Sequence, residues 1–248
     1  MFRRTLTLAL TLSVLAFGCS KHKVEIGREH PELEIQKCEK LAKKKRTQEA
    51  IDCFEIFKSR FADTAYGAQA ELAIADNYFA QKEYLIAADS YQSFLKVNPT
   101  HPKADYAAYR TGLSYLKEAP RPIDRDQQYL NQAVSHFEFT LRNFPNSPYL
   151  ETAKKDLAGA QTRLARRIFY IGRFYYRTGE YLAAIPRFEE LDDDYPEAPT
   201  HIKSLYYLTL SHLKLGHSVE AALALSKMET IYPDNAWTKK AAKKVKKK

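Results

Sequence analysis

The 248-residue sequence lacks the short motifs from which many enzymes build their active sites. It contains no glycine-rich phosphate-binding loop, no Cys-x-x-Cys pair and no serine in a nucleophile-elbow sequence. None of its seven histidines has another histidine four residues away, the spacing that places two metal ligands on one helix face. Acidic runs such as residues 192–194 are typical of solvated helix ends and turns. These absences predict a protein that is not an enzyme and that uses neither a cofactor nor a metal.

Glycine is also scarce, with 8 residues in the chain, and no long stretch alternates apolar and polar residues. Strict alternation would indicate half-buried β-strands, and its absence argues against a sheet. Apolar residues instead recur at spacings of three and four, which is the period of a helix with one buried face. We therefore expect an all-α protein.

The sequence has no apolar run long enough to cross a bilayer near its N-terminus, because Thr5–Phe17 is shorter than the required length of about 20 residues. This run follows Arg3 and Arg4 and fits the apolar part of a secretory signal. Gly18 and Cys19 then resemble the lipobox of bacterial lipoproteins, which implies a signal peptide over 1–18 and a lipid on Cys19. Ser20, where an aspartate would resemble an inner-membrane retention signal, favours the outer membrane. The alternative is a plain signal peptide followed by an incidental cysteine.

The net charge of +9 is not spread over the chain. Without Arg3 and Arg4, 37 basic residues face 30 acidic ones, and seven of those basic residues are lysines in 239–248. The body from Cys19 to Thr238 therefore carries 30 of each sign and is neutral, which argues against a nucleic-acid partner. The lysine tail has two interpretations, a solvated and frayed end or a contact with anionic lipid head groups.

A repeat organises the body of the chain. Four segments carry an alanine, an apolar or aromatic residue four places later, and a proline twelve places after the alanine. These triples are Ala87/Tyr91/Pro99, Ala133/Phe137/Pro145, Ala184/Phe188/Pro196 and Ala221/Leu225/Pro233, and Ala50/Phe54 begins a fifth copy. They resemble the second helix of a tetratricopeptide repeat, in which alanine permits close helix approach and proline ends the helix.

The predicted fold is an all-α, right-handed superhelical solenoid of about five tetratricopeptide-like helix pairs with a concave face. We place a lipidated tether at 19–31, repeats one to three at 32–147, repeats four and five at 148–238, and a basic tail at 239–248. The proline-rich and charged segment 117–130 predicts a loop between the two helices of repeat three.

Cys38 and Cys53 fall on the two predicted helices of repeat one, at equal distances from the turn near residue 45. They are therefore at the same height across the hairpin, where a disulfide is geometrically feasible. Two buried thiols are the alternative.

Three strings extend the resemblance beyond a general repeat. They are NPTHPKADYAAYRTGLSYL (98–116), DRDQQYLNQAVSHFEFTLRNFPNSPY (124–149) and YYRTGEYLAAIPRFEELDDDYPEAP (175–199). The chain resembles the BamD (ComL) family, the repeat lipoproteins of the outer-membrane β-barrel assembly machinery. The resemblance implies a lipid-anchored scaffold at the outer membrane that faces the periplasm. It also implies three kinds of partner: unfolded outer-membrane proteins at the N-terminal repeats, a BamA-like barrel protein at the C-terminal repeats, and further lipoproteins of the complex.

Position in the repeat suggests which residues contact these partners, since first-helix residues beside the packing positions line the concave face. For a peptide-binding groove we select Asp76, Phe79, Tyr106, Tyr109 and Leu113, and for partner docking Arg173, Tyr176, Tyr206 and Lys214. Aromatic rings on an open surface suit extended peptides, although any one tyrosine has core packing as its alternative. The alternative function is a structural adaptor lipoprotein that links cell-wall or division complexes and has no client groove.

Overall fold

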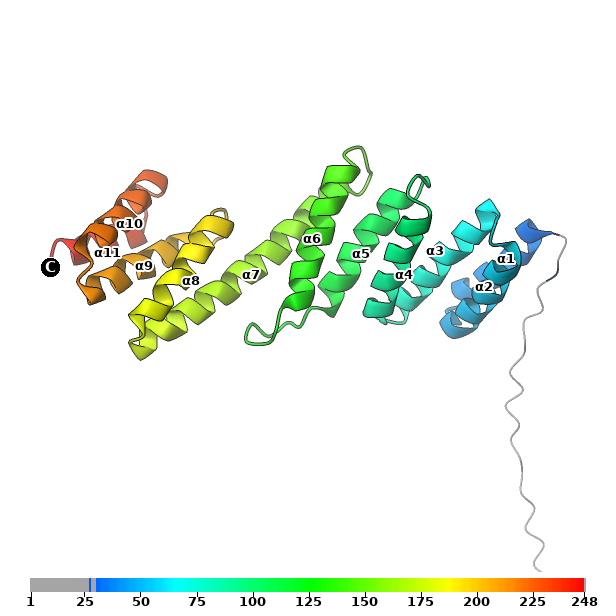
Figure 1. Cartoon of the computed structure of the whole chain (residues 1–248), viewed down its shortest axis with the longest axis horizontal. Coiled ribbons are helices and arrows are strands. Elements are labelled where there is room, and N and C mark those ends of the chain that lie inside the picture. Colours follow the sequence, from blue (N-terminus) through cyan, green and yellow to red (C-terminus); the bar gives the residue numbers. More distant parts are fainter. Residues whose placement is uncertain (1–26, 28–29, 248) are drawn as a thin grey trace, which may run out of the picture.

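A computed structural model describes residue 27 and residues 30–247 of the chain. That part contains eleven helices and no strand, and the helices stack in one elongated row with α1 and α11 at opposite ends (Figure 1). Among the described residues, none of the helices combines the length and the apolar character that a membrane span needs. Cys19, the predicted site of lipid attachment, lies outside the described residues.

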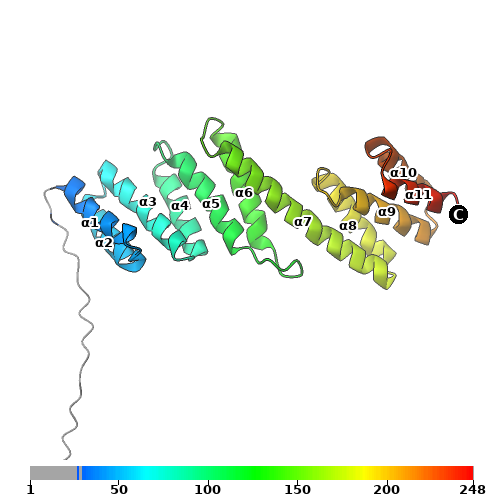
Figure 2. The same ribbon diagram turned by 180° about the vertical axis from the view of Figure 1, so that it is seen from behind.

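The helices form five antiparallel pairs, and consecutive pairs pack side by side in both views of the row (Figures 1 and 2). The pairs are α1 (Pro31–Lys43) with α2 (Thr47–Phe61), α3 (Ala65–Ala80) with α4 (Tyr84–Val97), α5 (Ala104–Glu118) with α6 (Gln128–Asn143), α7 (Leu150–Thr178) with α8 (Tyr181–Asp194), and α9 (His201–Leu215) with α10 (Ser218–Ile231). A last helix, α11 (Ala236–Val245), follows. The predicted all-α solenoid of five helix pairs is confirmed.

The repeated alanine and aromatic positions hold each pair together. Ala133, Phe137, Ala184 and Phe188 are all fully buried. Each of these phenylalanines faces a glycine of the first helix: a Cβ at Gly112 would lie 2.8 Å from the Phe137 ring, and one at Gly172 would lie 2.7 Å from the Phe188 ring. These separations are shorter than van der Waals contact, so the two helices approach as closely as they do only because glycine has no side chain there.

The predicted loop in repeat three joins α5 to α6 and is held by side chains. The Gln127 amide donates hydrogen bonds to the carbonyls of Pro120, Pro122 and Arg125, at 3.0–3.2 Å. Arg163 and Arg167 of α7 also donate to carbonyls of this loop, Arg163 to Pro120 at 2.9 Å. The 29-residue α7 thus contacts the loop from its middle, while its first half packs on α6 and its second half packs on α8, which connects the two halves of the row.

Of the two interpretations of the 239–248 tail, a frayed end is wrong for residues 239–245. These residues belong to α11, which packs on α9 and α10 and extends the solenoid by one helix. Ala241 is fully buried, and Trp237, Ala242 and Val245 pack on the same core cluster. The apolar residues at these spacings give α11 one buried face, which a count of lysines does not reveal.

Cys38 of α1 and Cys53 of α2 are joined in a disulfide, with their Cα atoms 5.4 Å apart. Both residues are fully buried within the core of the first pair. Of the two alternatives open from the sequence, the structure therefore has the disulfide.

Candidate protein-binding surfaces

Five side chains from three neighbouring helices meet around one carboxylate. We call them the Asp76 cluster: Asp76 and Phe79 of α3, Tyr91 of α4, and Tyr106 and Arg110 of α5. The hydroxyls of Tyr91 and Tyr106 both donate to Oδ1 of Asp76, at 2.5 and 2.7 Å. The two tyrosines thereby fix the carboxylate between the second and third helix pairs.

Arg110 completes the cluster. Its guanidinium carbon lies 3.7 Å from the centre of the Phe79 ring, its Nε donates to the Tyr91 hydroxyl at 3.0 Å, and its Nη2 lies 3.8 Å from Asp76 Oδ1. The arginine side chain is 18 % exposed, whereas that of Asp76 is 41 % exposed. The cluster therefore offers a solvent-accessible carboxylate next to an aromatic ring and a fixed positive charge.

Burial raises the pKa of Tyr91 and that of Tyr106, and the negative charge of Asp76 raises both further. The two phenols thus stay protonated throughout the physiological pH range and remain hydrogen-bond donors to Asp76. Because one carboxylate oxygen is occupied by these donors, the other is the group that can accept backbone N–H groups of a bound chain.

Two of the predicted groove residues lie elsewhere. Tyr109 is only 8 % exposed, stacks on Tyr149 with ring centres 5.4 Å apart, and donates to Asp156 Oδ2 at 3.0 Å. Burial, reinforced by the charge of Asp156, raises its pKa to about 12. Leu113 packs on the same core cluster. The structure thus places these two residues in the packing between α5, α6 and α7, and only Asp76, Phe79 and Tyr106 of the predicted set come together.

Sequence reasoning missed Arg110 and Tyr91. Arg110 follows Tyr106 by four residues, so the two lie on one face of α5, and this spacing is the signal that identifies it. Tyr91 occupies the aromatic packing position of the repeat, and only the structure shows that its hydroxyl reaches out of the core to Asp76.

A second aromatic cluster lies in the C-terminal half. The Tyr176 and Tyr206 rings both contact Tyr207, with centres 5.0 and 5.4 Å apart, and Tyr206 also contacts Trp237 of α11 at 5.0 Å. Two of the four predicted docking residues are therefore joined through Tyr207, which sequence reasoning missed. Arg173 on α7 and Lys214 on α9 are exposed and stand outside this aromatic cluster.

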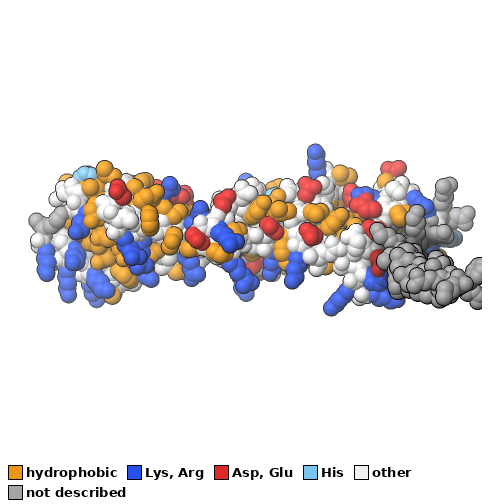
Figure 3. All heavy atoms as spheres, turned by 90° about the horizontal axis from the view of Figure 1, so that it is seen from below, with side chains coloured by type: hydrophobic (Ala, Val, Ile, Leu, Met, Phe, Trp, Pro, Cys, Tyr) orange, Lys and Arg blue, Asp and Glu red, His pale blue; other side chains and the backbone are white. Residues whose placement is uncertain are grey.

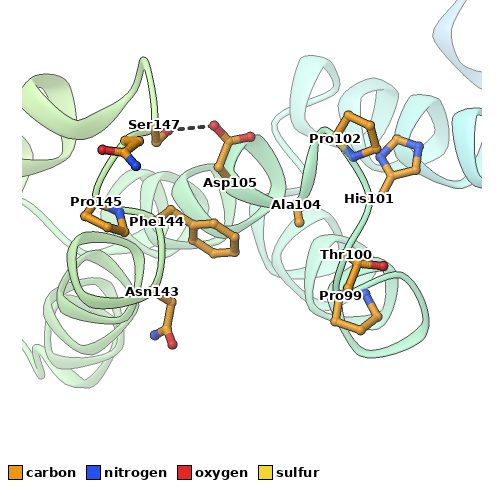
Figure 4. A pocket seen from close by; sticks show the side chains of 11 residues that line it. Pro99, Thr100, His101, Pro102, Ala104, Asp105, Asn143, Phe144, Pro145 and Ser147 are labelled. Carbon is orange, nitrogen blue, oxygen red and sulfur yellow. Dashed lines mark hydrogen bonds between the residues drawn. The ribbon is translucent and has the colours of Figure 1, made fainter.

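A cavity of about 370 Å³ lies between the turn that precedes α5 and the turn that follows α6 (Figure 4). Residues 99–102 and 143–147 line it, together with Ala104 and Asp105. The Ser147 hydroxyl donates to Asp105 Oδ2 at 2.7 Å and ties the two turns together, as the dashed line in Figure 4 shows. The sequence 98–105, part of the most distinctive string, thus helps to fix α5, which carries Tyr106 and Arg110.

A family model described as YfiO, outer membrane lipoprotein, matches residues 34–222. The chain belongs to the YfiO family. The matched YfiO residues include the Asp76 cluster and all four predicted docking residues, and they end within α10, so α11 lies beyond the match.

Relatives of this YfiO-family chain are named as outer membrane protein assembly factors. It is 28 % identical over 222 residues to the outer membrane protein assembly factor BamD of Vibrio cholerae serotype O1, covering 86 % of this chain and 92 % of that one. It is 30 % identical over 206 residues to BamD of Rickettsia prowazekii, covering 83 % and 82 %. The predicted resemblance to BamD is confirmed. Among solved structures, the TPR2AB-domain:pHSP90 complex of yeast Sti1 aligns at 16 % identity and a TM-score of 0.43, covering 86 % of this chain and 81 % of that one.

Proposed function

We propose that this chain is a lipid-anchored, non-catalytic scaffold for outer membrane protein assembly. The observation that carries the proposal is the breadth of the match, because relatives named as assembly factors align along most of their own length. The family match includes the Asp76 cluster and the four predicted docking residues, which supports a scaffold with two partner surfaces. The family description, outer membrane lipoprotein, supports Cys19 as the lipidated residue and the periplasmic side of the outer membrane as the location.

The Asp76 cluster is the proposed client surface. An unfolded outer-membrane protein presents unpaired backbone groups and alternating aromatic side chains. The free oxygen of Asp76 accepts backbone N–H groups, while Phe79 and Tyr106 contact aromatic side chains. Client recognition on this surface requires no enzyme chemistry, since the cluster supplies hydrogen bonds and apolar contacts alone.

The C-terminal aromatic cluster is the proposed docking surface for a BamA-like barrel protein and for other lipoproteins of the complex. Tyr176 and Tyr206 supply rigid apolar area, and Arg173 and Lys214 add exposed positive charges on the same two helices, α7 and α9. Aromatic anchors with charges at the rim are the usual composition of a protein–protein contact.

Phe79→Ala is expected to weaken binding of a peptide that copies the aromatic-ended last strand of a barrel protein by about tenfold, as loss of an interface aromatic commonly does. The substitution removes both the apolar contact and the ring on which Arg110 stacks. Fluorescence anisotropy with a labelled peptide measures the change in Kd.

Phe139→Ala is the matched control, because Phe139 is a 42 % exposed phenylalanine of α6 outside the Asp76 cluster. Its Kd is expected to equal that of the unmodified chain. Equal peptide affinity of the Phe79→Ala and Phe139→Ala proteins, with both folded by circular dichroism, would remove the Asp76 cluster from the proposal.

Affinity capture from outer membranes tests the scaffold as a whole. The tagged chain is expected to recover a BamA-like barrel protein, and Cys19→Ala is expected to release more of the chain into the soluble fraction when membranes are washed with about 1 M salt, because the lipid anchor is the attachment that salt does not screen. Recovery of cell-wall or division proteins without the barrel protein would favour the adaptor function instead. A mass of the membrane-derived chain that shows Cys19 without an acyl group would contradict the lipid anchor.

A further inference from the structure

The outer face of α11 is made of lysine. Six described lysines are exposed on and just after this helix: Lys239, Lys240, Lys243, Lys244, Lys246 and Lys247. At 3.6 residues per turn the four lysines within the helix occupy one arc of about 140°, and Lys246 and Lys247 directly follow its last turn. The buried residues Thr238 and Ala241 lie on the opposite side, against α9 and α10. The lysines therefore form one continuous face, which we call the lysine face, on a helix whose orientation the core fixes.

This positive charge is almost uncompensated. Residues 235–248 contain no acidic residue, and the ion pair recorded for the lysine face joins Lys239 Nζ to Asp234 Oδ1 at 3.9 Å. The Asp234 side chain is 99 % exposed, so water screens that pair strongly. Because residues 19–238 carry equal numbers of basic and acidic residues, the whole excess charge of that mature chain is concentrated at one end of the row. Figure 3 shows basic side chains projecting along one edge of that end.

The choice of lysine indicates what kind of anion this face meets. Arginine is the usual residue where a carboxylate or phosphate is held by two parallel hydrogen bonds in a dry interface, because its guanidinium is planar and weakly hydrated. Lysine keeps a strongly hydrated point charge on a flexible stem. A face with six lysines and no arginine therefore suits a diffuse, hydrated anionic surface better than a shape-complementary acidic protein.

We propose that the lysine face of α11 binds the surface of a bilayer that contains anionic phospholipids. This adds a second membrane contact to the scaffold function and deepens its proposed anchoring. The predicted lipid attachment precedes α1, whereas α11 ends the row at the opposite pole (Figure 1). With contacts at both poles the row lies along the membrane, and the helix pairs between them are held near the bilayer surface.

The chain contains a single tryptophan, and this residue, Trp237, is on α11 itself. Its fluorescence therefore reports on this helix alone, even when the N-terminus is already attached to the membrane. The full chain, purified with its N-terminal modification, is reconstituted onto phosphatidylethanolamine vesicles with or without about 30 % phosphatidylglycerol, and a nitroxide on the lipid head group serves as the quencher. We expect quenching of Trp237 on the anionic vesicles and not on the neutral ones. Raising the salt from about 0.1 M to about 1 M is expected to abolish it, because the screening length falls from about 10 Å to about 3 Å.

The variant K243Q/K244Q/K246Q/K247Q removes four lysines and leaves Lys240, whose Nζ lies 4.8 Å from the Trp237 ring, in place. Each lysine near an anionic surface strengthens attachment about fivefold, so this variant is expected to dock at least about 100-fold more weakly. The matched control, K96Q/K103Q/K117Q/K155Q, removes the same charge from exposed positions in the middle of the row and is expected to behave like the unmodified chain.

Three results would overturn the proposal. These are absence of Trp237 quenching on anionic vesicles at low salt, equal quenching on neutral and anionic vesicles, and equal quenching of the α11 variant and its control. The first of these is also the result expected if an acidic protein is the true partner. None of these readouts depends on client binding or barrel-protein capture, so failure here leaves the scaffold function intact. Loss of barrel-protein capture with normal Trp237 quenching would contradict the scaffold function and leave the proposal for the lysine face intact.

Discussion

Replacing Phe188 with alanine is expected to destabilise the C-terminal half by about 3–5 kcal/mol, the usual cost of emptying a buried phenylalanine site. Phe188 is fully buried in α8, and its ring lies 6.2 Å from that of Phe169 and 5.9 Å from that of Tyr207. Gly172 contacts the same ring, and its backbone cannot move into the space left by the missing ring unless all of α7 moves. The cavity therefore stays open, and chemical denaturation measures its free-energy cost.

The damage is expected to be local. In a solenoid each helix pair contacts only its neighbours, so stability is close to a sum of pair and interface contributions. Hydrogen exchange of Phe188→Ala should show lost protection in α7 to α10, with α1 to α4 unchanged. Phe174→Ala is the control, because Phe174 belongs to the same half but is 56 % exposed, and we expect it to cost less than 1 kcal/mol. Uniform loss of protection along the chain would contradict nearest-neighbour coupling.

Phe188 also connects stability to docking. Tyr207 stacks on Phe188 and contacts both Tyr176 and Tyr206, so a collapse around Phe188 displaces the proposed docking surface. Peptide binding at the Asp76 cluster, which lies on α3 to α5, is expected to survive the same substitution. The two proposed surfaces are therefore expected to fail separately, as the proposed scaffold with two partners requires.

The repeat was predictable from sequence because its signal is local. Alanine, an aromatic residue four places on and a proline twelve places on describe one helix and its end, and each such helix has one buried face whatever its neighbours are. Gly112 and Gly172 add the complementary surface on the first helix, where only glycine fits beside a phenylalanine. The fold class and the pairing of helices follow from these residues.

The surfaces were only partly predictable, because they depend on how neighbouring pairs are oriented. Successive helix residues point about 100° apart, which is enough to put Tyr109 in the core and Arg110 on the surface with Tyr106. Sequence position does not fix the angle at which neighbouring helices cross, and this angle decides which of the two residues is buried. The helix in the lysine tail was not predicted for a different reason. The composition of the tail suggested solvation, because the residues that pack α11 on its neighbours, among them Trp237 and Ala241, are few beside the lysines.

Reduction of the Cys38–Cys53 disulfide is expected to lower the stability of the first helix pair by about 3 kcal/mol, the entropic value for a loop of about 15 residues. The pair stands at the end of the row, where α1 packs on α2 and α3. It therefore receives no support from a preceding pair. Hydrogen exchange with and without reductant is expected to show faster exchange in α1 and α2 after reduction.

The variant C38A/C53A separates the bond from the packing of its sulfur atoms, since its exchange rates should not respond to reductant. Unchanged protection of α1 after reduction of the unmodified chain would show that packing alone holds this pair. The effect bears on the proposed function because Ile74 of α3 shares the core of the first pair, while Asp76 and Phe79 of the same helix belong to the proposed client surface. Loosening α1 and α2 uncovers the back of α3, so reduced protein is expected to bind the client peptide more weakly. Since disulfides persist in the compartments outside the cytoplasm, the proposed client surface is expected to reach its full rigidity only after export.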